Sequence, residues 1–277
     1  MICYIKVKAI YINKDIITNK ILNKGLLMEN KDIIINNTNS WKKDKNDIRD
    51  KKYSSSWKIK YFPRFKEGVD LRDKLSEVEN QKNLNSCTAN AIATSIEMNN
   101  GYKDISRLFL YYESRIKSNE PLKDDGAYLR DVLKIAKIGV CEETLWQYLE
   151  YNVNVKPNIQ SYNNRLYKIN SYTRLSDNPK EKEKQIYHAL DTNKVIVFGT
   201  IIFKSFMNLN EGYYERKPFV NDPIMGYHAV ALVGYEKNKS VIVRNSWGKD
   251  WGEEGYCYFP INYVIDRNYN DDFWVIE

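Results

Sequence analysis

Histidine and cysteine are scarce in this sequence of 277 residues. Its two histidines, His188 and His228, are too few for a His-rich metal site. Its cysteines are too few and too scattered for a disulfide framework in a chain of this length, and no two of them have metal-ligand spacing. The four are Cys3, Cys87, Cys141 and Cys257. We therefore expect no bound metal, no organic cofactor and no disulfide scaffold.

Long apolar stretches are also missing. No run reaches the roughly 18 apolar residues that indicate a membrane-spanning helix. Lys, Asn and Asp interrupt every apolar stretch near the start of the chain, so no signal peptide is indicated. Without a disulfide framework or a signal peptide, we predict an intracellular protein. The composition, 43% hydrophobic and 29% charged, excludes a wholly disordered chain, a collagen and a coiled-coil rod.

The positive charge is confined to one end of the sequence. Residues 1–69 carry 16 Lys and Arg against 7 Asp and Glu, whereas residues 70–277 carry 27 against 29. The basic excess therefore belongs to a Lys-, Asn- and Ile-rich segment with weak periodicity. We interpret residues 1–56 as a solvated extension, whose Lys-rich stretch before Tyr53 is removable, and residues 57–277 as the folded domain. Binding of an anionic partner by the lysines is the alternative, and a nucleic acid partner is not favoured.

Helical patterns come first along the domain, and strand patterns follow. Helices are predicted over residues 88–100, 106–118 and 127–138, with Ser106 as the cap of the second and Gly139 ending the third. Residues 152–185 are polar and indicate an irregular connection. Strands are predicted over residues 194–203, 228–235, 240–247 and 255–260, with a hairpin between the middle two. The absence of β-α-β alternation predicts an α+β fold with a helical and a β-rich subdomain.

Cys87 lies where a cysteine gains nucleophilic character. It stands in the first turn of the first predicted helix, within NSCTANA. The unpaired N–H groups and the partial positive charge of a helix N-terminus stabilise a thiolate, which is the nucleophilic form. Taken alone, a free cysteine is more often a small buried hydrophobe. We expect Cys141 and Cys257, in apolar surroundings, to be inert.

His228 and Asn245 are predicted to meet across a hairpin. His228 lies at the start of one predicted strand, and Asn245 lies near the end of the next. Neighbouring antiparallel strands bring such positions together, and an amide oxygen can fix the tautomer and direction of an imidazole. Taken alone, His228 would be interpreted as a structural histidine of the core, and Asn245 as a turn residue. We place His188 on a surface helix, outside any site.

Together with Cys87, these motifs resemble the papain-like cysteine peptidases, in particular the branch with the signature L-x-S-C-T-A-N-A. The order Cys, His, Asn and the 141 residues between Cys87 and His228 are those known for papain and cathepsins. The resemblance covers about residues 57–277 and includes a long, specific motif, NSWGKDWGEEGY. Other matching segments are VDLR (69–72), VENQ (78–81), DGA (125–127), GV (139–140) and GYHAV (226–230).

The resemblance implies a role for each matching residue. Cys87 corresponds to the nucleophile, His228 to the base and later acid, and Asn245 to the residue that orients His228. Gln81 corresponds to the side-chain donor of the oxyanion hole, beside the Cys87 backbone N–H. The residues implied in substrate binding or in shielding the His–Asn bond are Asp125, Gly126, Tyr227 and Trp247.

Some positions depart from the family pattern. Asp125 replaces the first glycine of a Gly-Gly pair, and Tyr227 stands where papain has Asp. Both departures concern the preference for substrate rather than the catalytic reaction. The first 69 residues contain no long helical pattern like the family's inhibitory propeptide, so we do not expect zymogen control of the usual kind.

We predict a monomeric cysteine peptidase whose partner is a polypeptide substrate. One alternative is an acyl transferase that uses the same site. The other is an inactive, peptide-binding protein of this fold.

Overall fold

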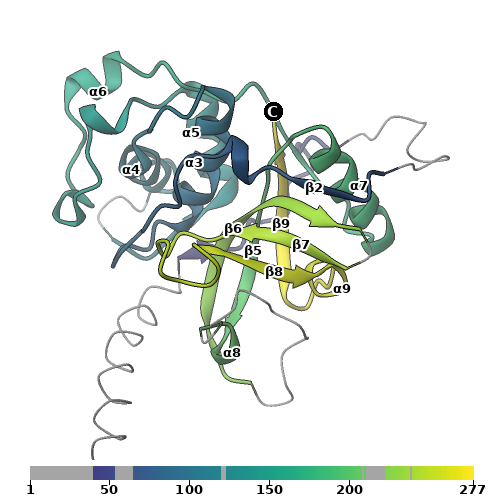
Figure 1. The fold of residues 1–277 in the computed structure, drawn as a ribbon. Helices are drawn as coiled ribbons and strands as arrows, with labels where there is room; N and C mark the ends of the chain where they lie inside the picture. Colours follow the sequence, from purple (N-terminus) through teal and green to yellow (C-terminus); the bar gives the residue numbers. More distant parts are fainter. Residues whose placement is uncertain (1–39, 54–64, 120–122, 208, 210–221, 238) are drawn as a thin grey trace, which may run out of the picture.

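The computed structural model describes residues 40–53, 65–119, 123–207, 209, 222–237 and 239–277. These residues form a group of helices and an antiparallel sheet, which lie side by side (Figure 1). The predicted α+β fold, with a helical and a β-rich part, is confirmed. No helix of these residues is long and apolar enough to cross a membrane.

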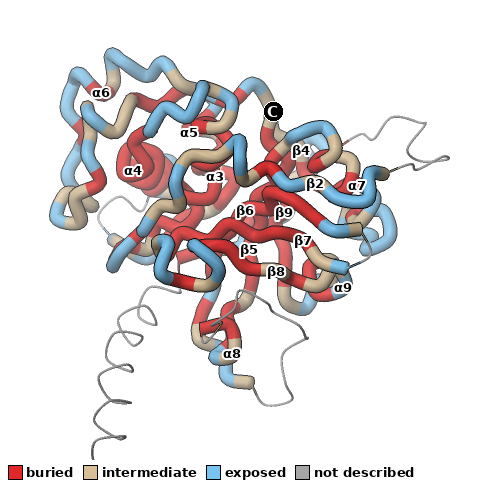
Figure 2. The backbone as a smooth tube through the Cα atoms, viewed as in Figure 1, coloured by how far each residue is buried: buried red, intermediate tan, exposed pale blue. Residues whose placement is uncertain are grey.

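The helical part is built around α3 (Cys87–Asn99), which packs against α4 (Arg107–Lys117), α5 (Leu129–Ile138) and strand β6 (Ile224–Glu236) of the sheet. Every residue of α3 from Cys87 to Glu97 is buried. Figure 2 shows the core running from this helix into the sheet. A helix enclosed on all sides needs small and apolar side chains, which the Ala- and Ile-rich sequence supplies.

Local signals set the ends of the predicted helices. The Ser106 hydroxyl accepts a hydrogen bond from the Phe109 backbone N–H at 3.1 Å and so caps α4. Gly139, with φ of 131°, follows the last residue of α5. Both signals were visible in the sequence.

The larger sheet has the strand order β4-β9-β5-β6-β7-β8, and β2 pairs with β6 beyond that path. All pairs in it are antiparallel, and β6 and β7 form the predicted hairpin. The strands are β2 (Gly68–Asp70), β4 (Tyr172–Arg174), β5 (Ile196–Phe203), β6 (Ile224–Glu236), β7 (Ser240–Arg244), β8 (Tyr256–Pro260) and β9 (Asn270–Ile276).

The interpretation of residues 152–185 as irregular was incomplete. This stretch contains α6 (Ile159–Asn163), β4 and the first turns of α7 (Pro179–Asp191). β4 exists because it pairs with β9, with Tyr172 opposite Ile276, and a contact between segments so far apart leaves no local pattern. The remaining short helices are η1 (Arg72–Lys74), η2 (Glu143–Leu145), η3 (Glu150–Asn152), α8 (Lys204–Met207) and α9 (Ile261–Val264).

Part of the predicted extension is built into the fold. Residues 40–53, here called the N-terminal segment, include β1 (Trp41–Lys42), which pairs in parallel with β3 (Ala127–Tyr128). Trp41 and Tyr53 are buried, so this segment is not a solvated tail. Residues 1–39 and 54–56 lie outside the described residues, and the division at residue 56 stays a prediction.

Candidate active site

Cys87 begins α3, and its thiol lies where the helical part meets the sheet. The sulfur accepts hydrogen bonds from the Ala229 backbone N–H of β6, at 3.2 Å, and from the Ser40 hydroxyl, at 2.8 Å. The side chain is wholly buried. Burial raises the pKa of the Cys87 thiol to about 12, although both hydrogen bonds act to lower it. The closed structure therefore favours the neutral thiol and not the expected thiolate. The loss of solvation on burial outweighs the stabilisation of a thiolate by the helix N-terminus.

His228 lies in β6, one residue before Ala229, and contacts Asn245 just after β7. Its Nε2 and the Asn245 Oδ1 are 2.7 Å apart. An amide oxygen only accepts, so Nε2 donates and the lone pair of the neutral ring is on Nδ1. Among the described residues, Nδ1 has no hydrogen-bond partner. Burial lowers the pKa of His228 to about 4, and the bond with Asn245 opposes this. His228 is therefore neutral and can accept a proton.

Trp247 covers the imidazole. The rings of His228 and Trp247 have centroids 4.8 Å apart and an interplanar angle of 33°. The indole is buried and packs edge-on against Phe206 and Trp251. This aromatic cover limits the access of water to the bond between His228 and Asn245, and a low local dielectric strengthens that bond.

Gln81 is held beside Asn245 by the backbone. Its N–H donates to the Ser246 carbonyl oxygen at 2.8 Å, and its side-chain Oε1 accepts from the Ser246 hydroxyl at 2.7 Å. Its Nε2 donates to the Leu84 carbonyl oxygen at 2.8 Å. An amide carries two N–H donors, so beyond this bond one donor of Gln81 remains for a ligand.

The N-terminal segment crosses the site directly in front of Cys87. The Ser40 N–H donates to the Tyr227 carbonyl oxygen at 3.0 Å, and the Ala127 N–H donates to the Ser40 carbonyl oxygen at 3.1 Å. Together with the bond from the Ser40 hydroxyl to Cys87 Sγ, these contacts close the site. The Ser40 carbonyl oxygen is held by Ala127, on the helical side of the site.

Three of the predicted substrate-binding residues contact this segment. Asp125 pairs with Lys42 at 3.0 Å, and Tyr227 bonds to Ser40 as described. Gly126 has φ of 90°, and a Cβ there would lie 2.5 Å from the Ser40 oxygen, so only glycine lets a backbone pass this closely. The fourth residue, Trp247, lies on the His228 side of the site.

The sequence model of the papain family cysteine proteases matches residues 65–268. This chain belongs to the papain family. It is 36% identical over 263 residues to an uncharacterized peptidase C1-like protein of Acanthamoeba polyphaga mimivirus, which covers 85% of this chain and 84% of that protein. It is 27% identical to falcipain-3 of Plasmodium falciparum, over 72% of this chain and 40% of that protein.

A solved structure agrees with the papain-family assignment. Xylellain, a cysteine protease from Xylella fastidiosa, is similar with a TM-score of 0.77 and 31% identity, over 87% of this chain and 96% of xylellain. The functional roles of Cys87, His228, Asn245 and Gln81 remain predictions that this likeness supports.

The sequence did not reveal every residue that shapes this papain-family site. Asp124 Oδ1 accepts hydrogen bonds from the Asn85 N–H at 3.0 Å and from the Tyr111 hydroxyl at 2.6 Å. The Gly126 N–H in turn donates to the Tyr111 oxygen at 3.1 Å. These bonds tie the loop before β3 to the start of α3. Asp124 adjoins a matching motif, which is a weak signal, whereas nothing local marks Ser40.

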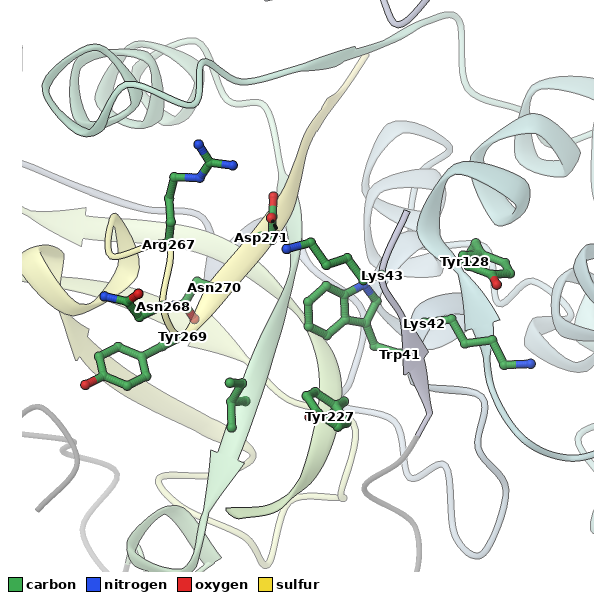
Figure 3. A pocket seen from close by; sticks show the side chains of 11 residues that line it. Trp41, Lys42, Lys43, Tyr128, Tyr227, Arg267, Asn268, Tyr269, Asn270 and Asp271 are labelled. Atoms are coloured by element: carbon green, nitrogen blue, oxygen red, sulfur yellow. Dashed lines mark ion pairs between the residues drawn. The ribbon is translucent and has the colours of Figure 1, made fainter. Parts of the chain in front are cut away.

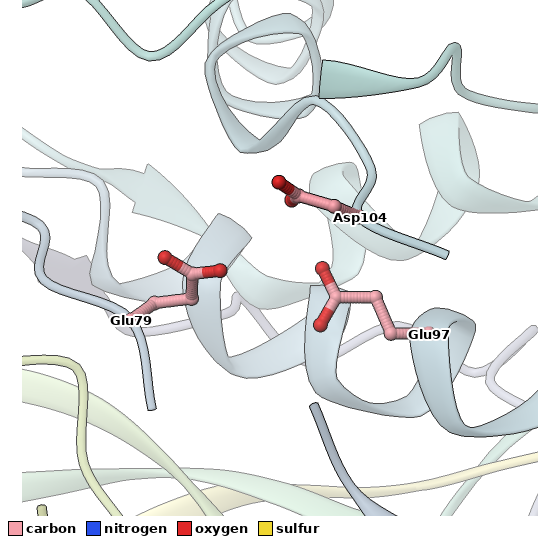
Figure 4. A group of neighbouring side chains, drawn as sticks. All are labelled: Glu79, Glu97 and Asp104. Atoms are coloured by element: carbon pink, nitrogen blue, oxygen red, sulfur yellow. The ribbon is translucent and has the colours of Figure 1, made fainter. Parts of the chain in front are cut away.

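Three carboxylates that are not among the predicted site residues gather in one place (Figure 4). Oxygens of Glu79, Glu97 and Asp104 lie within 4.8 Å of one another, close enough to hold a cation. The cluster has protein partners, however. Arg107 pairs with Glu79 at 2.9 Å, and the Ser76 hydroxyl donates to Glu97. Burial raises the pKa of Glu97 to about 7, so the protonated and the charged form of this carboxyl group are both populated near neutral pH.

The other cysteines and His188 lie outside the site. Cys141 and Cys257 are buried, and burial raises the pKa of both thiols, which disfavours reactive thiolates. His188 lies on α7 as expected, but it is half-buried, and its Nδ1 is 2.6 Å from the Tyr53 hydroxyl. Cys3 lies outside the described residues.

Proposed function

We propose that this papain-family chain is a cysteine peptidase that hydrolyses peptide bonds through a thioester at Cys87. The contact that carries the proposal is the 2.7 Å bond from His228 Nε2 to Asn245. It leaves the Nδ1 lone pair of His228 without a partner among the described residues. Because Ala229 bonds to the Cys87 sulfur, the neighbouring imidazole and the thiol share one small region.

The chemistry needs one proton carrier and one nucleophile. His228 takes the thiol proton at Nδ1 while the Cys87 sulfur attacks the substrate carbonyl carbon. The proton then passes to the leaving amine as the C–N bond breaks, and an acyl thioester remains. A water molecule gives a proton to His228 and attacks the thioester, the C–S bond breaks, and the proton returns to sulfur.

Negative charge on the substrate oxygen requires fixed donors. The Cys87 backbone N–H and the remaining N–H of Gln81 are the proposed pair. Loss of one such donor in a hydrolase costs roughly 2.7–4 kcal/mol of transition-state stabilisation. Gln81 is fully buried and bonded to Leu84 and Ser246, so it pays little entropy to hold this position.

The function also requires the N-terminal segment to leave. Ser40 bonds to the Cys87 sulfur, and its backbone is held on both sides by Tyr227 and Ala127. A test therefore needs a chain without this obstacle. We define the truncated chain as the protein that begins at Tyr53.

The first experiment is alkylation of the truncated chain with a thiol-directed epoxide near neutral pH, followed by mapping of the modified cysteine. We expect rapid labelling at Cys87 and hydrolysis of a mixed peptide pool. Both should be lost in Cys87→Ala, and labelling should collapse in His228→Ala. Cys141→Ala is the matched control, because it removes a buried thiol outside the site.

Three other outcomes would count against hydrolysis. Slow labelling of several cysteines, with no cleavage of peptides, would favour an inactive, peptide-binding protein. Labelled enzyme that joins an acyl group to an added amine, with little free acid formed, would indicate a transferase. Equal labelling of wild type and His228→Ala would show that no Cys–His pair forms.

A further inference from the structure

The hydroxyl of Tyr148, in the loop between η2 and η3, bridges the two segments that supply the proposed oxyanion-hole donors. It donates to the Gln81 backbone carbonyl oxygen at 2.9 Å and lies 2.5 Å from the Ser86 hydroxyl. A phenol carries one proton. Since that proton is on the side of Gln81, it is Ser86 that donates to Tyr148. Ser86 directly precedes Cys87, so one hydroxyl contacts the residue of one donor and the neighbour of the other.

The Ser86 end of this bridge is held in turn by Asn90 and Arg107. Asn90 Nδ2 donates to the hydroxyl and to the carbonyl oxygen of Ser86, at 3.0 Å each. That carbonyl belongs to the same planar peptide unit as the Cys87 N–H, so the bond helps to fix the direction of this donor. Arg107 donates to Asn90 Oδ1 at 3.0 Å and pairs with Glu79 at 2.9 Å.

The hydrogen bonds between Arg107 and Gln81 all run in the same sense. Arg107 donates to Asn90, Asn90 to Ser86, Ser86 to Tyr148, and Tyr148 to Gln81. Bonds aligned in this way polarise one another, and this chain of bonds begins at a cation. Each of these residues is at most 7% exposed. A satisfied polar network in a dry interior is rigid, which is what the spacing of two fixed donors requires.

The ring of Tyr148 is also held in place. The Arg107 guanidinium carbon lies 4.4 Å from the ring centroid, in a cation–π contact. The Tyr148 backbone N–H donates to the Glu143 carboxylate. Burial raises the pKa of Tyr148 above its ordinary value. The hydroxyl therefore keeps its proton and remains a donor to Gln81 across the neutral range.

Tyr148 is separate from the segment that closes the site. Within the part of the chain that the structure describes, none of its hydrogen bonds or ring contacts reaches the N-terminal segment. Figure 3 shows the pocket that holds Trp41 of that segment, beside Tyr227, and Tyr148 does not line it. A change at Tyr148 is therefore not expected to alter how the site opens.

We propose that Tyr148 is a positioning residue, whose hydroxyl sets the separation of the two oxyanion-hole donors, the Gln81 amide and the Cys87 N–H. This inference rests on the proposed peptidase function. Tyr148 acts through Gln81 and Ser86 and does not itself contact the reacting atoms. Negative charge develops on the substrate oxygen only as sulfur attacks, and misplacement by about 1 Å can lower a rate roughly a hundredfold.

The test compares two reactions of Cys87 in the full chain with Trp41→Ala, which weakens docking of the N-terminal segment. Alkylation by a small haloacetamide needs the thiol and His228 but places no new charge on a carbonyl oxygen, whereas peptide hydrolysis does. The fraction of open sites enters both rate constants equally. The ratio of kcat/KM for hydrolysis to the alkylation rate constant therefore reports on the oxyanion hole.

In Tyr148→Phe we expect this ratio to fall by about tenfold or more, through kcat and with little change in KM. Tyr235→Phe is the matched control. Tyr235 is 2% exposed, its hydroxyl donates to the Lys66 carbonyl oxygen at 3.1 Å, and it lies near the end of β6, away from His228. Each variant loses one hydroxyl from the interior, so Tm should fall in both, but only Tyr148→Phe should lower the ratio. An unchanged ratio in Tyr148→Phe would overturn the proposal.

Gln81→Ala tests whether Tyr148 acts through the oxyanion hole. Without the Gln81 amide, Tyr148→Phe should lower hydrolysis much less than it does when the amide is present, because one of the two donors is missing. Equal falls in both backgrounds would show a role elsewhere. Ser86→Ala breaks the bridge from its other end and should also lower the ratio. The proposal therefore does not depend on the folding of one variant, and an unchanged ratio in Ser86→Ala would contradict the bridge.

If no peptide is cut, the peptidase function fails, and Tyr148 is judged with a peptide aldehyde instead. The Cys87 sulfur adds to the aldehyde carbon, the carbonyl π pair moves to oxygen, and the thiol proton passes to His228. The adduct places an oxygen where the transition state has one. Tyr148→Phe should weaken aldehyde binding about tenfold and leave binding of the matching peptide alcohol unchanged. Equal aldehyde affinity with and without the hydroxyl would overturn the role of Tyr148.

Discussion

Burial sets the ionisation of Cys87 and His228 while the site is closed. It raises the pKa of the thiol to about 12 and lowers the pKa of the imidazole to about 4. Between these values both groups are neutral, which is the form that requires least solvation in a dry interior. Departure of Ser40 admits water and substrate to the thiol. We therefore expect an ion pair to become accessible only when the site opens.

At the residue scale, Asn245 is expected to act through His228. Asn245→Ala in the truncated chain removes the acceptor that fixes the imidazole, and a hydrogen bond to a charged ring is worth roughly 1.5–3 kcal/mol. We expect kcat for peptide hydrolysis to fall by roughly ten- to a hundredfold, with a smaller change in KM. Asn163→Ala is the matched control, since Asn163 is exposed on α6. An unchanged kcat would show that His228 is held by its neighbours alone.

At the scale of the element, the N-terminal segment is tied to β9 through two carboxyl groups. The Asp44 N–H donates to Asp272 Oδ2 at 2.6 Å, and Asp44 Oδ2 accepts from the Trp274 indole at 3.1 Å. Burial, reinforced by the nearby Asp272 carboxylate, raises the pKa of Asp44, and Arg130 opposes the rise. Burial also raises the pKa of Asp272, although Arg174 lies beside it.

The raised pKa of Asp44 predicts that docking of the N-terminal segment weakens as pH rises. The docked state favours the protonated acid, whereas a released Asp44 returns to an ordinary pKa near 3.8. The stabilisation is therefore complete below that ordinary value and is lost as pH rises through the raised one. We expect alkylation of Cys87 in the full chain to accelerate from about pH 5 to about pH 8 more steeply than thiol ionisation alone requires.

Asp44→Asn separates the two causes of this acceleration. The variant keeps the shape of the side chain but does not titrate at that position, whereas the ionisation of Cys87 is the same in both proteins. Its alkylation rate should rise less steeply with pH than that of the wild type. Equal pH dependence of the alkylation rate in the two proteins would show that titration of Asp44 does not control docking of the N-terminal segment.

At the scale of the whole molecule, the N-terminal segment joins the two parts of the fold. Asp50 pairs with Arg130 of α5 at 2.8 Å and with Arg174 of β4 at 3.8 Å. The same segment buries Trp41 against β5. The N-terminal segment therefore both closes the site and links the helices to the sheet. Its release is expected to open Cys87 to substrate and to lower the stability of the fold at the same time.

Removal of residues 1–52 is expected to raise activity and lower stability together. The loss of the buried Trp41 alone is typically worth roughly 3–5 kcal/mol, so Tm should fall by at least about 5 °C. Hydrolysis and Cys87 labelling should both increase. A truncation that removes only residues 1–39 is the matched control, because it keeps the described segment. If the two truncations had equal Tm and equal labelling rates, the N-terminal segment would neither stabilise the fold nor block Cys87.

The sequence by itself determined the features that depend on neighbouring residues. Helical spacing, the Ser106 cap and Gly139 located the helices, since these are interactions within a few residues. The hairpin predicted for β6 and β7 placed His228 against Asn245, because neighbouring antiparallel strands joined by a short turn bring such positions together. The motif around Cys87 pointed to the family.

Only the tertiary structure decided how the site is closed. Ser40 lies on Cys87, and Trp41 lies between Gly199 and Asp272, although long stretches of chain separate these residues. Such contacts depend on the packing of distant elements, which leaves no period in a local sequence. The neutral state of the Cys87 thiol was hidden for a related reason, because its pKa depends on burial by the whole fold.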